Sequence, residues 1–171
     1  DSGVIMDIGH GAGSFSFATA EKLIDAGYRP DVISSDIHQF SVHGPLFDLP
    51  TCLSKFLALG MSLEEVIAAA TIRPAEVMGM QNEVGTLKAG ALADIALWQL
   101  EAGDFTLYDV HMEPRQSKQL LRNTLTFIDG RELVAQSDDP PMPWITLTEK
   151  QQELIESGHT PQAMVAHKCS C

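Results

Sequence analysis

The residues best suited to chemistry are Asp36 and His38, which follow an apolar stretch and two serines. If residues 32–38 form a strand, Asp36 and His38 share one face, because side chains alternate along a strand. A second apolar stretch, residues 4–8, is followed in the same way by His10. Since α/β enzymes place their catalytic groups at the carboxyl ends of strands, both stretches mark a candidate site.

The segment between these two strands is expected to be a helix. Apolar residues recur at helical spacing over residues 15–26, and Gly27 and Pro30 supply a stop. A strand, a helix and a strand in succession predict a crossover unit with two parallel neighbouring strands. Both strands are apolar along most of their length, which is typical of parallel strands covered on both faces.

A glycine-rich turn, residues 9–14, follows the first strand. It lacks the GxGxxG spacing of dinucleotide-binding proteins and the lysine of a P-loop, so nucleotide binding is not predicted. Gly11 and Gly13 either let the backbone approach a ligand closely or serve only the turn. His10 is likewise either a core or turn histidine bonded to a neighbour, or a group that contacts substrate or supports Asp36.

Helix signals continue to about residue 79, after which the pattern changes. Asp48 and Pro50 open one helix, and Ser62 with Glu65 forms a capping box for the next. From about residue 84 the sequence predicts short strands, with a hairpin of residues 124–128 and 131–134 around an Asp-Gly turn. A proline-rich linker and a helix over residues 148–157 are expected to follow.

Composition excludes some classes of partner. The chain has 171 residues and a net charge of −12, with 44% hydrophobic and 20% charged residues. This balance indicates a globular protein and argues against nucleic acid and anionic membrane surfaces as partners. Three cysteines without framework spacing point to a reducing compartment, so we expect a cytoplasmic protein in which Cys52 is a buried thiol. No signal peptide and no apolar run of membrane length is present.

Three segments together resemble the amidohydrolase superfamily, in particular its deacetylase and dihydroorotase-like metallohydrolases. The segments are Asp-Ile-Gly-His-Gly-Ala-Gly-Ser-Phe at residues 7–15, Ile-Ser-Ser-Asp-Ile-His at 33–38, and Gly-Thr-Leu-Lys-Ala-Gly at 85–90 with Ala93 and Asp94. The helices of residues 49–71 and the Pro-Ala pair at 74–75 fit as well. The resemblance covers residues 1–134.

The resemblance implies an α/β fold, the C-terminal part of a (β/α)8 TIM-like barrel followed by the C-terminal share of a small β-sandwich. Residues 1–84 would hold barrel strands seven and eight with their helices, residues 85–134 the sandwich segment, and residues 135–171 a linker, a short helix and a disordered tail. A complete barrel takes about 250 residues. The family's His-x-His pair, lysine and later histidines are expected upstream, so we expect a fragment.

The resemblance also implies the roles of individual residues. The strand-eight aspartate of the family binds metal and shuttles the proton, and this role falls on Asp36. His10, His38, His43 and Gly11 are expected to contact substrate. The implied cofactor is a divalent metal, one or two zinc ions, whose other ligands lie upstream.

Together these features predict a metal-dependent hydrolase that cleaves an amide or ester bond, with an acyl or acetyl group as its target. Attack would come from metal-bound hydroxide, and Asp36 would carry the proton. The alternatives are a cyclic amidase of dihydroorotase type, and a non-catalytic fragment or degenerate paralogue that serves as a scaffold. The expected partner is a small molecule with an acyl or amide group, and a homo-oligomer is compatible with the sequence. Residues 1–171 alone are expected to be inactive.

Overall fold

The computed structural model describes residues 3–42, 44–134 and 149–156. The elements follow in the order β1 (Asp7–Gly9), α1 (Phe17–Asp25), β2 (Val32–Ser34), α2 (Leu49–Ala58), α3 (Leu63–Ala70), α4 (Ile72–Val77), β3 (Ile95–Tyr108), β4 (Pro114–Ile128), β5 (Arg131–Glu132) and α5 (Glu149–Glu156). No helix within these ranges is long and apolar enough to span a membrane.

The first three elements form the predicted crossover unit. β1 and β2 pair in parallel, with Ile8 opposite Ile33 and Gly9 opposite Ser34, and α1 connects them. β1 is shorter than the sequence predicts, because Val4 and Ile5 lie before it and are 72% and 52% exposed. Two parallel strands joined by a helix fit part of a barrel, the fold class that the family resemblance implies.

The helices begin where the sequence places their caps. The Asp48 carboxylate accepts a hydrogen bond of 2.7 Å from the backbone N–H of Thr51 and caps α2. The predicted capping box of α3 is present, because Ser62 and Glu65 each bond to the other's backbone N–H. These local bonds set the start of both helices and therefore the faces that they bury.

An antiparallel ribbon forms the second half of the described chain. β3 and β4 are both long and pair along most of their length, and β5 adds a short third strand. The Asp129-Gly130 hairpin is confirmed, and both turn residues have positive φ angles of 50° and 70°. The sequence predicts short strands here, whereas β3 has 14 residues and β4 has 15. A second sheet facing this one is not described, so the sandwich stays a prediction.

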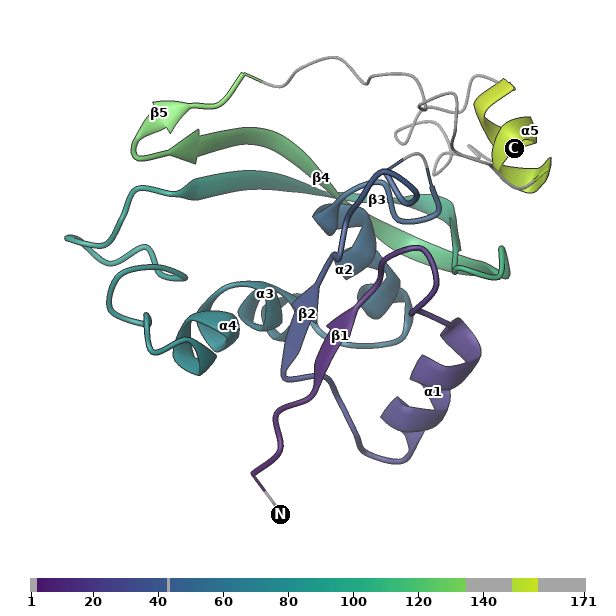
Figure 1. The fold of residues 1–171 in the computed structure, drawn as a ribbon, viewed down its shortest axis with the longest axis horizontal. Helices are drawn as coiled ribbons and strands as arrows, with labels where there is room; N and C mark the ends of the chain where they lie inside the picture. Colours follow the sequence, from purple (N-terminus) through teal and green to yellow (C-terminus); the bar gives the residue numbers. More distant parts are fainter. Residues whose placement is uncertain (1–2, 43, 135–148, 157–171) are drawn as a thin grey trace.

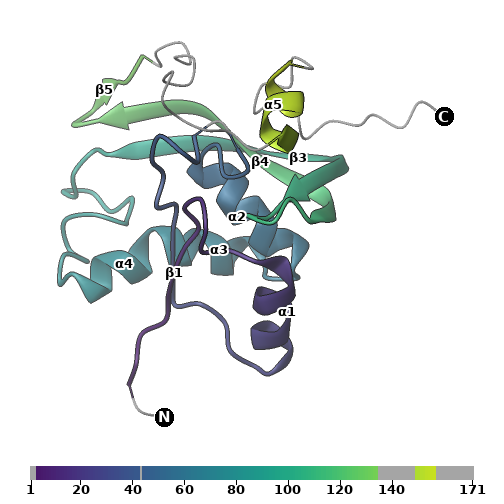
Figure 2. The same cartoon turned by 45° about the vertical axis from the view of Figure 1, so that its right-hand side comes forward.

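Helices α1 to α4 lie beneath the ribbon, as Figures 1 and 2 show. α2 packs against β4, while α1 and the pair α3–α4 lie on opposite sides of the parallel strands. One core joins both halves of the chain, with buried side chains from the crossover unit, α2 and the ribbon. Its members include Phe15, Phe17, Phe47, Leu53, Phe56, Phe105, Leu107 and Leu120.

Two buried polar side chains tie the helices to the ribbon. The Ser54 hydroxyl donates to the carbonyl of Pro50 at 2.7 Å and accepts from the backbone N–H of Leu121 at 2.9 Å. The Asp109 carboxylate accepts from the backbone N–H groups of Phe17, His111 and Glu113. These bonds fix α1 and α2 relative to β3 and β4.

We predict that Ser54→Ala lowers the stability of the protein. Alanine removes the acceptor of the buried Leu121 N–H, and an unsatisfied buried donor costs about 1–3 kcal/mol. Urea denaturation should show this loss in the free energy of unfolding. Ser16→Ala is the control, because Ser16 makes no capping bond to α1. Equal stability of the two variants would contradict the role given to Ser54.

Candidate functional site

Asp36 lies two residues beyond the end of β2. Val32 and Ile33 within the strand are both buried, whereas the Asp36 side chain is exposed. The φ angle of Asp36 is 48°, so the backbone leaves the extended conformation here. Aspartate tolerates this left-handed conformation better than most residues. The strand end therefore presents a carboxylate in the place that the sequence predicts.

Gly11 lies against the Asp36 carboxylate. The backbone N–H of Gly11 donates to the carbonyl of Ser35 at 3.0 Å, which joins the turn after β1 to the end of β2. Gly11 has a φ angle of 50°, and a Cβ atom at this position would lie 2.5 Å from Oδ2 of Asp36. Any side chain at position 11 would displace the carboxylate, so glycine is required here by close approach as well as by the backbone conformation.

His10 is fully buried behind this turn. Its Nε2 lies 2.6 Å from Nζ of Lys55, and its Nδ1 lies 2.9 Å from the carbonyl oxygen of Gly11. A carbonyl can only accept and an ammonium can only donate, so the hydrogen bonds assign the ring proton to Nδ1 and leave Nε2 as the acceptor. The ring stacks on Phe15, with 4.9 Å between the ring centroids.

Burial controls the charge of this pair. Together with a smaller effect of the nearby Lys55 amine, it lowers the pKa of His10 to about 3. It also lowers the pKa of Lys55 to about 7, against smaller opposing effects of Cys52, Asp109 and Asp48. His10 is therefore a neutral imidazole at neutral pH, and Lys55 donates a hydrogen bond to it in either protonation state.

The other residues predicted to contact substrate lie in different positions relative to Asp36. His38 is exposed on the loop after Asp36, where its Nδ1 accepts from the backbone N–H of Phe40 at 3.2 Å. His43 lies outside the described residues. Asp36 and Gly11 are brought into contact, His10 lies beneath them with both ring nitrogens bonded to the protein, and His38 lies on the solvent side.

Sequence reasoning missed Lys55. Its side chain is fully buried and also donates to the carbonyl of Pro45 at 2.8 Å. The available signal was composition: Lys55 is the one charged residue in α2, whose sequence is otherwise apolar or small on every face. A helix that is apolar all round is buried, so a lysine within it must have partners inside the protein.

Asp36 is the one candidate metal ligand that the described residues place at this site. Asp36 is exposed, and Gly11 leaves room for its carboxylate, which suits a group that reaches into an open site. Within the described ranges no three His, Cys, Asp or Glu side chains gather closely enough to hold an ion. Asp36 thus fits as one contributor to a metal site whose other ligands come from elsewhere.

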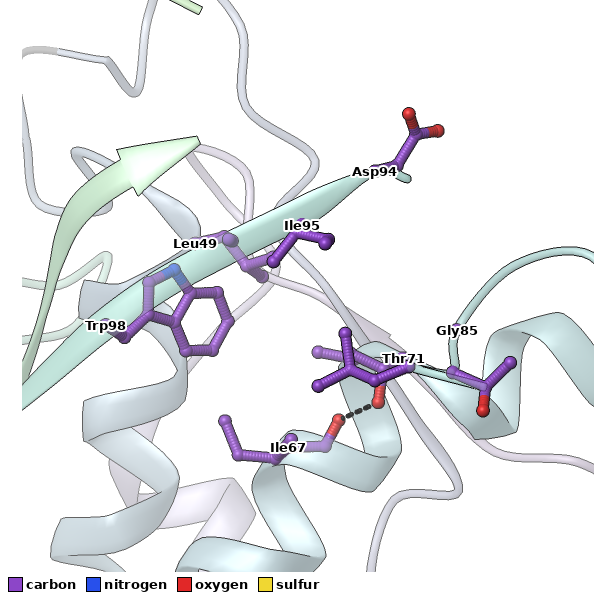
Figure 3. Close-up of a pocket in the computed structure, with 11 residues that line it drawn as sticks. Leu49, Ile67, Thr71, Gly85, Asp94, Ile95 and Trp98 are labelled. Atoms are coloured by element: carbon purple, nitrogen blue, oxygen red, sulfur yellow. Dashed lines mark hydrogen bonds between the residues drawn. The ribbon is translucent and has the colours of Figure 1, made fainter. Parts of the chain in front are cut away.

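A cavity among the described residues lies away from this site. It is an open, mainly apolar groove of about 570 Å³ between α3 and the start of β3, lined by residues that include Ile67, Thr71, Ile95 and Trp98 (Figure 3). None of the candidate site residues borders it. Its one carboxylate, that of Asp94, precedes the antiparallel strand β3 and accepts a hydrogen bond of 2.8 Å from the backbone N–H of Asp129. Asp36 instead follows the parallel strand β2, so we place the chemistry at the parallel strand ends.

Comparison with known proteins identifies the family. The profile of the amidohydrolase family matches residues 16–133, and the chain belongs to this family. A deacetylase of Agrobacterium fabrum is 37% identical over 135 residues, covering 79% of this chain and 33% of the relative. A deacetylase of Brucella anthropi is 35% identical over 133 residues, covering 78% and 33%. The chain thus spans about a third of the length of these relatives.

Solved structures agree with the family assignment. The chain is similar to a crystal structure of an adenine deaminase, with a TM-score of 0.72 and 35% identity over 77% of this chain and 36% of the other. It is also similar to a crystal structure of a dihydroorotase, with a TM-score of 0.70, 35% identity, and coverage of 78% and 35%. The predicted family resemblance is therefore confirmed.

We predict that His10 makes stability depend on pH. The unfolded chain binds a proton at His10 as pH falls below its ordinary pKa of 6.5, whereas the folded protein resists until about pH 3. The free energy of unfolding should therefore fall as pH is lowered from 6.5 towards 3. Denaturation at several pH values should show a smaller fall for His10→Gln, while the exposed His111→Gln should follow the wild type.

Proposed function

We propose that the protein is a metal-dependent hydrolase that cleaves an amide or ester bond, with an acyl or acetyl group as its target. The observation that carries this proposal is the Asp36 carboxylate, exposed at the carboxyl end of β2 and accommodated by Gly11. Membership of the amidohydrolase family and relatives named deacetylase support it. The substrate class is a small molecule with an acyl or amide group.

Asp36 would help to hold the metal, and its carboxylate is proposed to carry the proton. A divalent metal, which we take to be zinc, would when bound make a water more acidic and polarise the substrate carbonyl. The water oxygen bonds to the carbonyl carbon of the substrate, and the Asp36 carboxylate accepts the proton that this water loses. The same carboxyl group then donates that proton to the leaving nitrogen or oxygen, which departs as the amine or alcohol.

The neighbouring residues serve this carboxylate in different ways. Gly11 allows the close approach that sets its position. His38 lies on the exposed loop two residues further on, from which it contacts the substrate. His10 acts from beneath Gly11, because its ring is buried and both its nitrogens are bonded to other groups. We therefore propose that His10 supports the site instead of contacting the substrate directly, which is the role expected from the sequence.

A cyclic amidase is the second candidate function. The similarity to a dihydroorotase structure favours it, and the reaction needs the same carboxylate chemistry on an amide within a ring. A third possibility, a scaffold without catalysis, predicts no turnover of either substrate. Assays with 4-nitroacetanilide, a linear acetamide, and with dihydroorotate, a cyclic amide, separate the three.

We predict that Asp36→Asn abolishes turnover in the complete protein that contains residues 1–171. Asparagine keeps the shape of the side chain but cannot accept and return a proton. Turnover of the accepted substrate should fall by at least about 1,000-fold, within the range of general acid–base catalysis. Circular dichroism should show an unchanged fold.

The matched control is Asp25→Asn, at the exposed end of α1, which should keep wild-type turnover. Asp36→Asn activity within tenfold of the wild type, at unchanged metal content, would remove Asp36 from the mechanism and with it the central support for the proposed hydrolase.

We also predict that residues 1–171, produced without further sequence, retain no stoichiometric zinc and no activity. A single carboxylate cannot hold zinc tightly, since stable sites use three or four protein ligands. Elemental analysis after dialysis is the measurement. One tightly held zinc per chain would contradict the proposal that other ligands are needed and would redirect attention to His10, His38 and the Cys-x-Cys sequence at residues 169–171.

A further inference from the structure

The buried Lys55 amine lies at the centre of a set of contacts that leads to Asp36. Nζ of Lys55 is 2.6 Å from Nε2 of His10 and 2.8 Å from the carbonyl oxygen of Pro45. It also lies 5.8 Å from the centre of the Phe15 ring, on which His10 stacks. Two hydrogen bonds and an aromatic face satisfy an amine that burial would otherwise make costly.

One branch of these contacts reaches the carboxylate through the turn after β1. His10, held by Lys55, donates from Nδ1 to the carbonyl of Gly11. The same glycine donates its own N–H to the carbonyl of Ser35 and lies in van der Waals range of the Asp36 carboxylate. A rotation of the His10 ring would release the Gly11 peptide and with it the surface against which Asp36 rests.

The other branch reaches the loop after β2. Pro45 follows Asp36 and His38 in the chain, and its carbonyl is the second acceptor of Lys55. Within this loop the backbone N–H of Phe47 donates to the carbonyl of Ser41, and the Ser41 hydroxyl bonds to the backbone of His38. Lys55 therefore anchors, from α2, both loops that border the candidate carboxylate.

We propose that Lys55 is a positioning residue for hydrolysis: it holds His10 in its Nδ1–H form and joins the Gly11 turn to the Pro45 loop, and so fixes the Asp36 carboxylate. The proposal rests on the proposed function, in which Asp36 carries the proton. It differs from a purely structural role because it requires one ring tautomer of His10 and a loss in kcat when that tautomer is released. Second-layer contacts of this kind change activity by about 10–100-fold in metalloenzymes.

The test uses Lys55→Met in the complete protein that contains residues 1–171, because methionine keeps length and apolar volume but donates no hydrogen bond. Lys22→Met, on the exposed surface of α1, is the matched control. Turnover of 4-nitroacetanilide gives kcat and KM. Proteins labelled uniformly with nitrogen-15 report the tautomer of His10 and the backbone amide signals by NMR, with the His10 ring signals assigned from His10→Gln.

We expect kcat to fall about 10–100-fold in Lys55→Met with KM within about threefold, and no change in Lys22→Met. The wild type should show the proton of His10 on Nδ1, and Lys55→Met should lose this fixed form and shift the backbone amide signals of Gly11 and Asp36. If His10 of the wild type carries its proton on Nε2, the proposal is overturned. This measurement needs no variant, so it decides the matter even if Lys55→Met folds poorly.

Unchanged kcat and unchanged Gly11 and Asp36 signals in a folded Lys55→Met protein also overturn it. Failure of the proposed function is distinguished by Asp36→Asn. If that variant keeps wild-type turnover, Asp36 is not the proton carrier, and the His10 measurement still reports whether Lys55 fixes the ring.

Discussion

The burial of one amine organises the polar part of this structure. Lys55 has no exposed surface, so the fold must supply acceptors for it, and these come from His10 and Pro45. Because the acceptors lie on the two loops that follow β1 and β2, satisfying the amine also brings these loops together. The cost of burying a polar group thus becomes a geometric constraint on the strand ends where Asp36 lies.

Local features of the sequence predicted local structure well. The capping box of Ser62 and Glu65, the Asp48 cap and the Asp129-Gly130 turn all follow from bonds between residues close in the chain. The place of Asp36 at a strand end was also predictable, because an apolar run that stops at small and acidic residues is a short-range pattern. The family resemblance then gave this residue its expected role.

Contacts between residues far apart in the chain could not be predicted from the sequence. Lys55 and His10 are 45 residues apart, and only the packing of α2 against the turn after β1 joins them. The same holds for Ser54, which bonds to the N–H of Leu121, 67 residues away. β3 and β4 form one long ribbon although polar residues interrupt both, since pairing satisfies backbone groups that the side-chain pattern does not reveal.

The carboxyl end of β2 separates the buried supports from the exposed carboxylate in this chain. Within the strand, Ile33 packs in the core that Phe15, Leu53 and Phe56 share with the ribbon, and Lys55 and His10 lie within that packed interior. Beyond it, Ser34 is half-buried and the Asp36 side chain is exposed. A carboxylate that moves a proton must reach water and substrate, whereas its supports work best where water is excluded and hydrogen bonds are strong. The glycine at position 11 joins these two environments, because it is bonded to His10 on one side and touches Asp36 on the other.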